Sequence, residues 1–387
     1  MSAPTILMAG GGTGGHVFPL LSVARALEAL LPGLRLVFVG TDRGIEASVV
    51  PKAGYALELM HTRPFRGGGL SGASKGLLSV AQSLPRSREL LKKYAPAAVF
   101  SVGGYAAVPI SMAARLSRVP LALMEPNVTP GLANRLVGPV AKRVYTAFEE
   151  TDAYFSKAAL LRTGLAIRGG FEPKPYTWNA GGQPLRVLVL GGSQGARSLN
   201  LAVAPGLSQV KSPLDIVHQV GRGNLTVMRQ RYVELRRPGA SVIEFIEDMP
   251  AAIAAADLVI SRAGAGAIAE ICAVGRPSIL VPLAGSGAHQ LHNAQGAERI
   301  GAAVCLPSAR ASADGVALLV AELARDPARL ARMAESARAW GTPHAAARVA
   351  QDLLELAGLL ESTGAQNGAA SGPLPLEAPV ALGGKDA

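Results

Sequence analysis

The stretch TILMAGGGTGGHVFP (residues 5–19) places an apolar run directly before a glycine-rich turn and a helical pattern that continues to Leu31. This order of strand, glycine turn and helix presents backbone N–H groups to a phosphate. A P-loop would require Lys and then Ser or Thr after its last glycine, but here Gly15 is followed by His16 and Val17. The stretch therefore predicts an α/β fold with an anion-binding turn that carries a histidine where a P-loop carries lysine.

The second half of the chain repeats this plan. The sequence VLVLGGSQGAR (residues 187–197) again joins an apolar run to a glycine turn, about 180 residues after the first. Alternating helical patterns separate the expected strands, which cover residues 5–9, 35–40, 97–102, 121–124, 185–190, 215–220, 241–245, 258–261 and 278–282. The pattern predicts two doubly wound, Rossmann-like domains with parallel sheets, facing each other across a cleft.

Length and composition suit two or three domains with substantial cores. Of the 387 residues 49% are hydrophobic and 17% charged, which excludes disorder for most of the chain. We expect an N-terminal domain over residues 1–163, a linker over 164–184 and a C-terminal domain over 185–360. The last helix can pack back on the N-terminal domain, and residues 361–387 resemble a disordered tail.

Cysteine usage and the N-terminus predict a cytosolic protein. Cys272 and Cys305 have neither a disulfide framework nor metal-type spacing, and the first residues lack a secretory signal. Residues 94–114 carry no charge, but Pro96 and Pro109 favour strand, turn and helix start over a membrane span.

Positive charge is concentrated in the first half. Residues 1–163 hold 18 Lys and Arg against 9 Asp and Glu, whereas the remainder holds 20 against 18. A one-sided basic surface fits nucleic acid or an anionic membrane. Since aromatic residues are only 4% and no nucleic-acid module is present, we expect no nucleic acid as partner.

Three glycine loops stand at predicted strand ends. They are the first glycine loop (residues 10–16), the second (101–107, SVGGYAA) and the third (190–197, LGGSQGAR). One such loop alone is equally explained by a tight turn, but three in both halves favour a ligand that carries phosphate.

Further polar residues follow predicted strands. Glu270 suits a ribose diol or a helix surface, and Glu125 with Asn127 suits sugar hydroxyls or a helix cap. His289 and His292 lack an acidic third ligand nearby, so we expect no metal site.

The ordered set of motifs resembles the MurG family of N-acetylglucosaminyltransferases. It comprises GGGTGGHVFP, GTDRGIE, SVGGYAAVP, EPNVTPGLANR, GGSQGAR, HQVG and HQLHNA, and covers most of the chain. The resemblance implies a GT-B fold and inverting transfer of GlcNAc from UDP-GlcNAc to the C4 hydroxyl of MurNAc in undecaprenyl-pyrophosphoryl-MurNAc-pentapeptide. The product is lipid II of peptidoglycan, made at the cytoplasmic face of the inner membrane.

The same resemblance implies the partners. They are UDP-GlcNAc, the lipid-linked MurNAc-pentapeptide and an anionic membrane surface, with room for other proteins of cell-wall synthesis and division. Helix N-termini can stabilise a leaving diphosphate, so we expect catalysis without a metal or other cofactor.

By resemblance, the C-terminal domain holds the donor. Ser193, Gln194 and Gly195 would meet the diphosphate, the backbone of Phe245 and Ile246 the uracil, and Glu270 the ribose. GlcNAc hydroxyls would bind Gln290 and Asn293, with Arg168 close to the nucleotide. Donor contacts from the other domain would come from Thr13, Gly14, Gly15 and Asn127.

The N-terminal domain would hold the acceptor, through Gly11, Gly12, Thr13, Gly103, Gly104, Tyr105, Glu125 and Asn127. His16 is the expected base, because an unperturbed pKa of ~6.5 leaves much of it neutral at cytosolic pH. Glu125 is the rival base, and His16 could instead be a helix N-terminal residue that only bonds its own loop.

Two positions depart from the family pattern. Met124 stands where members often have His, and Ala263 in RAGAG replaces the serine of an SGA turn, so neither family side chain can act here.

Residues 63–93 mix basic and apolar side chains, which fits seating on anionic lipid or an ordinary amphipathic helix. The basic members are Arg63, Arg66, Lys75, Arg86, Arg88, Lys92 and Lys93.

Three other functions stay open: a different UDP-sugar transferase, a UDP-GlcNAc epimerase, and a non-catalytic membrane-associated scaffold. Retention of His16, Glu125, Glu270 and Gln290 together argues against the scaffold.

Overall fold

Strand β1 (Thr5–Gly10) and helix α1 (Gly14–Leu30) form the unit that the opening stretch predicts. The computed structural model describes residues 3–60, 69–179, 181–192, 195–283 and 288–361. All six residues of β1 are buried. A parallel strand covered by helices on both faces is buried in this way, which explains its continuous apolar run.

The first sheet is parallel, with strand order β3-β2-β1-β4-β5-β6-β7 in the described residues. Its other strands are β2 (Arg35–Gly40), β3 (Ala56–Leu59), β4 (Ala98–Gly103), β5 (Leu121–Glu125), β6 (Arg143–Thr146) and β7 (Leu160–Arg162). The connecting helices are α2 (Glu46–Lys52), α3 (Gly69–Tyr94), α4 (Ala107–Leu116) and α5 (Leu132–Val137).

The second sheet is also parallel, with order β10-β9-β8-β11-β12-β13. Its strands are β8 (Leu185–Leu190), β9 (Leu214–Gln219), β10 (Ser241–Ile243), β11 (Leu258–Ser261), β12 (Ser278–Leu280) and β13 (Ala303–Cys305). Its helices are α6 (Arg197–Gln209), α7 (Leu225–Glu234), α8 (Met249–Ala255), α9 (Ala265–Val274), α10 (Ala288–Arg299), α11 (Ala313–Ala324) and α12 (Pro327–Trp340). The predicted α/β class with two doubly wound sheets is confirmed.

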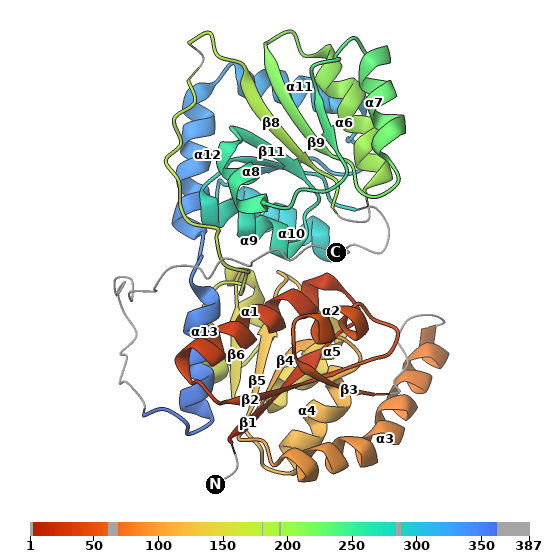
Figure 1. Cartoon of the computed structure of the whole chain (residues 1–387), viewed down its shortest axis with the longest axis vertical. Helices are drawn as coiled ribbons and strands as arrows, with labels where there is room; N and C mark the ends of the chain where they lie inside the picture. The colour runs from red at the N-terminus through yellow and green to blue at the C-terminus, as the bar shows by residue number, and fades with distance from the viewer. Residues whose placement is uncertain (1–2, 61–68, 180, 193–194, 284–287, 362–387) are drawn as a thin grey trace, which may run out of the picture.

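The strand order reverses at β1 in the first sheet and at β8 in the second. Ligands of open parallel sheets bind outside the carboxyl ends of the strands at such a switch point. The first and second glycine loops follow β1 and β4, and the third follows β8. Figure 1 shows the two sheets stacked along the long axis, with α9 and α10 of the upper half towards α1 and α2 of the lower.

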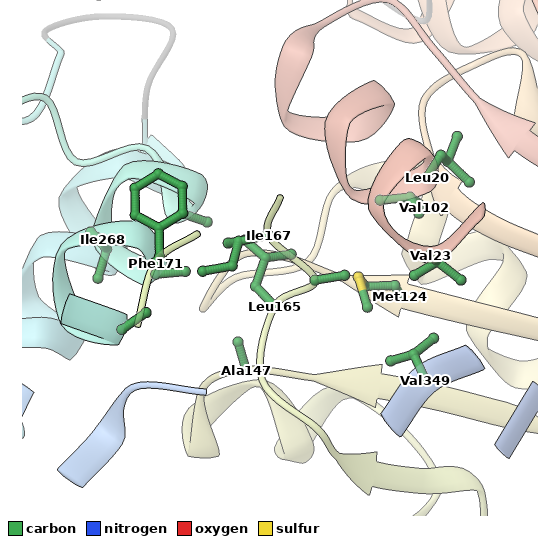
Figure 2. Packing of buried hydrophobic residues seen from close by; sticks show 14 of the residues in the cluster. Leu20, Val23, Val102, Met124, Ala147, Leu165, Ile167, Phe171, Ile268 and Val349 are labelled. Carbon is green, nitrogen blue, oxygen red and sulfur yellow. The ribbon is translucent and has the colours of Figure 1, made fainter. Parts of the chain in front are cut away.

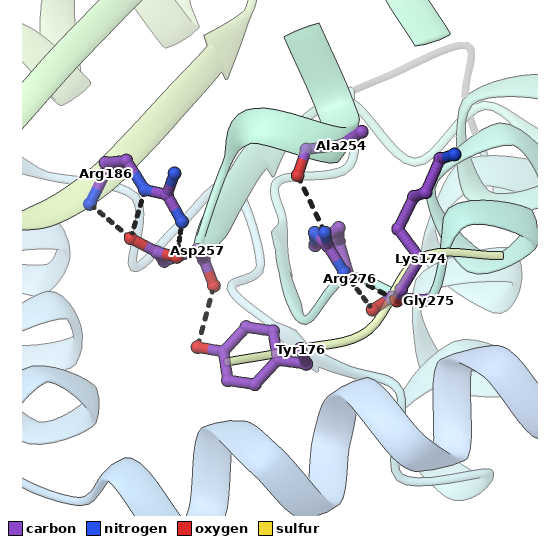
Figure 3. A network of polar contacts seen from close by, with 7 residues as sticks. All are labelled: Lys174, Tyr176, Arg186, Ala254, Asp257, Gly275 and Arg276. Carbon is purple, nitrogen blue, oxygen red and sulfur yellow. Dashed lines mark hydrogen bonds and ion pairs between the residues drawn. The ribbon is translucent and has the colours of Figure 1, made fainter. Parts of the chain in front are cut away.

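Residues 163–184 connect the two sheets, and Figure 3 shows the contacts of Lys174 and Tyr176 in this segment. Arg276 donates hydrogen bonds to the carbonyls of Lys174 (3.1 Å) and Ala254 (2.7 Å). The Tyr176 hydroxyl donates to the carbonyl of Asp257 (3.1 Å), whose carboxylate pairs with Arg186. The connection is therefore fixed to the second half of the molecule at Lys174 and Tyr176.

Helix α13 (Ala345–Leu356) returns to pack against α1 in the lower half of the molecule (Figure 1). One cluster of buried apolar residues includes Met124 of β5, Val349 of α13, Leu165 and Ile167 of the connection, and Ile268 of α9 (Figure 2). The apolar core thus runs from one sheet to the other through the connecting segment.

Four strands were absent from the sequence prediction: β3, β6, β7 and β13. Three of them are edge strands with partly exposed residues, and β6 begins with Arg143, so their apolar pattern is weak. The strand predicted over 241–245 ends at Ile243.

Candidate active site

The first glycine loop places His16 in the first turn of α1. Its Nδ1 lies 3.0 Å from the Gly11 carbonyl oxygen and 3.4 Å from Thr13 Oγ1. A carbonyl can only accept, so Nδ1 carries the hydrogen and Nε2 keeps its lone pair. No group in the described part of the chain is bonded to Nε2. The loop therefore presents an unprotonated ring nitrogen.

Burial, one hydrogen bond and two nearby charges set the pKa of His16. Burial lowers it below the usual value, while the Gly11 hydrogen bond and the charge of Glu46 raise it. The charge of His289 lowers it further. His289 belongs to α10, so a residue of the second half of the chain contributes to the pKa of His16. The net lowering favours the neutral imidazole that a general base requires.

The second glycine loop packs against the first. Gly103 and Gly104 have φ of +96° and +87°, and a Cβ at Gly104 would lie 2.6 Å from the Gly11 carbonyl oxygen. The Tyr105 hydroxyl is 3.5 Å from Thr41 Oγ1. The predicted acceptor residues of both loops are thus brought together with His16.

Glu125 ends β5 and is 1% exposed. Its Oε1 accepts from the backbone N–H (2.8 Å) and Nδ2 (3.0 Å) of Asn127. Its Oε2 accepts from Gly131 N (3.1 Å) and Asn134 Nδ2 (2.8 Å). Burial raises the pKa of Glu125 to about 7, although these donors lower it. Glu125 thereby organises the segment we name the Glu125 loop (residues 125–134).

Helix α10 docks on the Glu125 loop. The amide of Asn293 accepts from Val128 N (2.9 Å) and donates to Asn127 Oδ1 (3.0 Å) and the Ala263 carbonyl (3.3 Å). Thr129 binds His289 Nδ1 through its carbonyl (2.9 Å) and His292 Nδ1 through its hydroxyl (2.7 Å). Asn293, predicted to bind GlcNAc, is completely buried in this contact.

The third glycine loop precedes α6, and Gly195 N donates to the Gly192 carbonyl (3.0 Å). Ser193 and Gln194 lie outside the described residues. Arg262, which the sequence analysis missed, donates to Ser198 Oγ (2.6 Å) in the first turn of α6 and to the Val281 carbonyl (3.2 Å). It places a cation beside the N-terminus of α6. The signal for it was an arginine in the turn after β11.

Arg168 of the connection pairs with Glu270 of α9. Arg168 Nε lies 3.2 Å from Glu270 Oε1, and the carboxylate side chain is 22% exposed. Burial raises the pKa of Glu270, and Arg168 lowers it.

Gln290 Oε1 accepts from Leu283 N (3.0 Å). Phe245 is 56% exposed whereas Ile246 is buried.

Among the described residues, no three His, Cys, Asp or Glu side chains gather in a way that would hold a metal ion. Within the same part of the chain, no helix combines the length and apolar character needed to cross a membrane. Metal-independent catalysis therefore stays a prediction.

Comparison with known proteins identifies the family. The glycosyltransferase family 28 N-terminal domain matches residues 6–146, and the C-terminal domain of the same family matches residues 186–352. A UDP-N-acetylglucosamine--N-acetylmuramyl-(pentapeptide) pyrophosphoryl-undecaprenol N-acetylglucosamine transferase from Sorangium cellulosum is 47% identical over 360 residues, covering 91% of this chain and 88% of the relative.

Two further relatives agree. A protein of the same name from Syntrophotalea carbinolica is 40% identical, over 89% of this chain and 96% of its own. The crystal structure of Acinetobacter baumannii MurG is 30% identical, with a TM-score of 0.76 over 91% of this chain and 99% of that one. The chain belongs to glycosyltransferase family 28 and, within it, to the MurG group.

Proposed function

We infer that this protein transfers GlcNAc from UDP-GlcNAc to the C4 hydroxyl of MurNAc in undecaprenyl-pyrophosphoryl-MurNAc-pentapeptide, giving lipid II for peptidoglycan. The observation that carries the inference is the 47% identity, over nearly the whole chain, to a transferase whose name states this reaction. The parallel sheets with glycine loops at both switch points support it.

We propose His16 as the base. Its Nε2 would take the proton of the attacking hydroxyl while the hydroxyl oxygen bonds to the anomeric carbon and the bond from that carbon to UDP breaks. Inversion follows from attack opposite the leaving group. Glu125 is the weaker candidate, because both of its oxygens already accept two hydrogen bonds. The proposed role of Glu125 is to hold the Glu125 loop in place.

The donor is proposed to bind against the third glycine loop and the start of α6. Backbone N–H groups and a helix N-terminus stabilise the negative charge that develops on UDP. Arg262 beside Ser198 adds a fixed cation there. Glu270 would exchange its bond with Arg168 for the ribose diol, which frees Arg168 for the nucleotide.

We propose that the protein seats peripherally on anionic lipid at the cytoplasmic face of the inner membrane. Arg88 and Lys92 line, with Leu91 and Val119, a recess of about 400 Å³ between α3 and α4. A neighbouring recess of about 500 Å³ is also basic, with Arg115, Arg118 and Lys142 in its wall. Basic groups around apolar ones suit phospholipid headgroups.

The test is transfer of labelled GlcNAc from UDP-GlcNAc to a short-chain analogue of the lipid-linked acceptor, with wild type and His16→Ala compared. We expect wild type to form the disaccharide, also in a chelator, and His16→Ala to lose ~100-fold or more in kcat with KM for UDP-GlcNAc preserved. Epimerised or hydrolysed UDP-GlcNAc without disaccharide would overturn the assignment.

A further inference from the structure

Glu46, the first residue of α2, is a buried carboxylate without an assigned role. It is 1% exposed. Its Oε2 accepts from Gly12 N (2.8 Å), and its Oε1 accepts from Thr41 N (2.9 Å) and Thr41 Oγ1 (2.8 Å). No ion pair in the described part of the chain includes it. A buried charge is costly unless hydrogen-bonded, so three converging donors indicate a purpose-built pocket.

The carboxylate and His16 bind the two ends of one peptide group. The Gly12 N–H that Glu46 accepts and the Gly11 carbonyl that His16 Nδ1 approaches (3.0 Å) belong to the same planar unit. A negative charge at the N–H end polarises the peptide and makes its carbonyl oxygen a stronger acceptor. The contact therefore joins Glu46 to the imidazole through one rigid group.

Three glycines leave the space that Glu46 fills. A Cβ built at Gly11, Gly40 or Gly44 would overlap the Glu46 side chain. These glycines come from the first glycine loop, the end of β2 and the turn before α2. The loops after two neighbouring strands are thus shaped around this carboxylate.

We propose that Glu46 is a positioning residue for His16, acting through the peptide bond between Gly11 and Gly12. It fixes the tautomer with hydrogen on Nδ1 and so directs the lone pair of Nε2 to the substrate hydroxyl. No proton moves to Glu46. The proposal rests on the proposed function, in which His16 is the base.

The charge of Glu46 also affects how kcat/KM depends on pH. The groups that act on His16 are Glu46 from α2, which raises its pKa, His289 from α10, which lowers it, and the Gly11 carbonyl. Without the Glu46 charge the pKa of His16 falls further. The base would then stay neutral to lower pH, so the acid limb of kcat/KM would move to lower pH.

The experiment compares Glu46→Gln with Thr41→Val in the full chain. Thr41 donates two hydrogen bonds to Glu46 Oε1. In Glu46→Gln the amide oxygen is expected to keep these two bonds, which places the NH₂ group opposite the Gly12 N–H. Two donors then face each other, so the hydrogen bond to the peptide between Gly11 and Gly12 is lost. Thr41→Val instead removes one hydroxyl and leaves the charge and the Gly12 contact in place.

We expect Glu46→Gln to lower kcat by ~10- to 100-fold. The effect should be smaller than that of removing a carboxylate bonded directly to a catalytic histidine, because Glu46 acts through a peptide group. KM for UDP-GlcNAc should change by less than about 2-fold, and the acid limb should shift to lower pH. Thr41→Val should retain kcat within about 3-fold and keep the wild-type pH profile.

Failure of the proposal is distinguishable from failure of the proposed function. Wild type without disaccharide formation rejects the function. Active wild type, impaired His16→Ala and a Glu46→Gln variant with wild-type kcat and pH profile overturn the positioning role alone. If Glu46→Gln does not fold, ¹⁵N NMR of wild type, assigned with His16→Ala, decides: hydrogen on Nδ1 supports the proposal and hydrogen on Nε2 overturns it.

Discussion

Two titratable side chains of the site, His16 and Glu125, have opposite surroundings. His16 has one ring nitrogen fixed by a carbonyl and the other without a partner among the described residues, whereas all lone-pair directions of Glu125 face N–H groups. A general base needs a lone pair that the substrate can reach, whereas a carboxylate that holds a loop in place uses its lone pairs in hydrogen bonds. Hydrogen bonding thus favours His16 over Glu125 as the proposed base.

Glu125 makes stability depend on pH. Burial raises its pKa from 4.5 to about 7. Between these values the unfolded chain ionises this carboxyl, whereas the folded protein keeps the proton at the expense of one of the four hydrogen bonds that the ionised form accepts. The free energy of unfolding therefore falls as pH rises through this window. The contribution amounts to up to ~3 kcal/mol, and Glu125→Gln should remove it.

Urea unfolding of wild type and Glu125→Gln from pH 4.5 to 8 measures the difference. The stability of wild type relative to the variant should decline as pH rises to 7 and then level off. Glu335→Gln, at an exposed site on α12, is the control and should parallel wild type throughout. Parallel curves for Glu125→Gln would contradict the raised pKa.

At the scale of elements, α13 ties the end of the described chain to the N-terminal sheet. Asp352 accepts from Arg143 Nε (3.1 Å to each oxygen) and from the Tyr145 hydroxyl (2.8 Å). Tyr145 is completely buried in β6. One carboxylate therefore satisfies two donors of a strand that lies about 200 residues earlier in the chain.

Asp352→Ala should destabilise the protein by ~1–3 kcal/mol, because a buried hydroxyl and a guanidinium lose their acceptor. The measurement is the shift in the urea unfolding midpoint. Asp352→Asn, which keeps one oxygen acceptor, should recover part of the loss. Equal stability of wild type and Asp352→Ala would show that α13 is held by apolar packing alone.

The glycine-loop units were predictable because each has a buried strand, a turn that requires glycine and a helix in sequence order. The edge strands β3, β7 and β13 were not, because partly exposed short strands lack a continuous apolar run. Their pairing comes from the neighbouring strand.

At the scale of the whole molecule, the basic N-terminal domain contains two kinds of cation. Arg86 and Lys93 pair with Glu58, at 2.9 and 2.7 Å. Arg88 and Lys92 instead line the recess between α3 and α4. Arg63 and Arg66 lie outside the described residues, as does the side chain of Lys75. The proposed lipid contact therefore belongs to Arg88 and Lys92 more than to the paired residues.

Charge reversal at both positions, Arg88→Glu with Lys92→Glu, should weaken binding to vesicles containing anionic phospholipid. At ~1 kcal/mol for each basic residue near the surface, losing two costs ~30-fold in partitioning, and more when the signs reverse. Sedimentation with vesicles at low and moderate salt measures the change.

Arg325→Glu with Arg332→Glu makes the same change in net charge on the C-terminal half and is the control. It should bind nearly as wild type. An equal loss of vesicle binding in both double variants would show that binding follows the net charge of the protein and that no defined face contacts the membrane.

The sequence by itself determined the two-sheet α/β plan, the three loops at strand ends and the family, because these depend on local order: apolar run, glycine turn, helix. It also placed His16, Glu125 and Glu270 on the loops and helix that follow strands. Only the tertiary structure decided which distant residues meet. Glu46 accepts a hydrogen bond from the loop of His16, and Asn293 donates one to Asn127. Arg168 pairs with Glu270. The reason is that each of these contacts joins residues 34 to 166 positions apart, and a hydrogen bond between distant segments leaves no periodic trace in either.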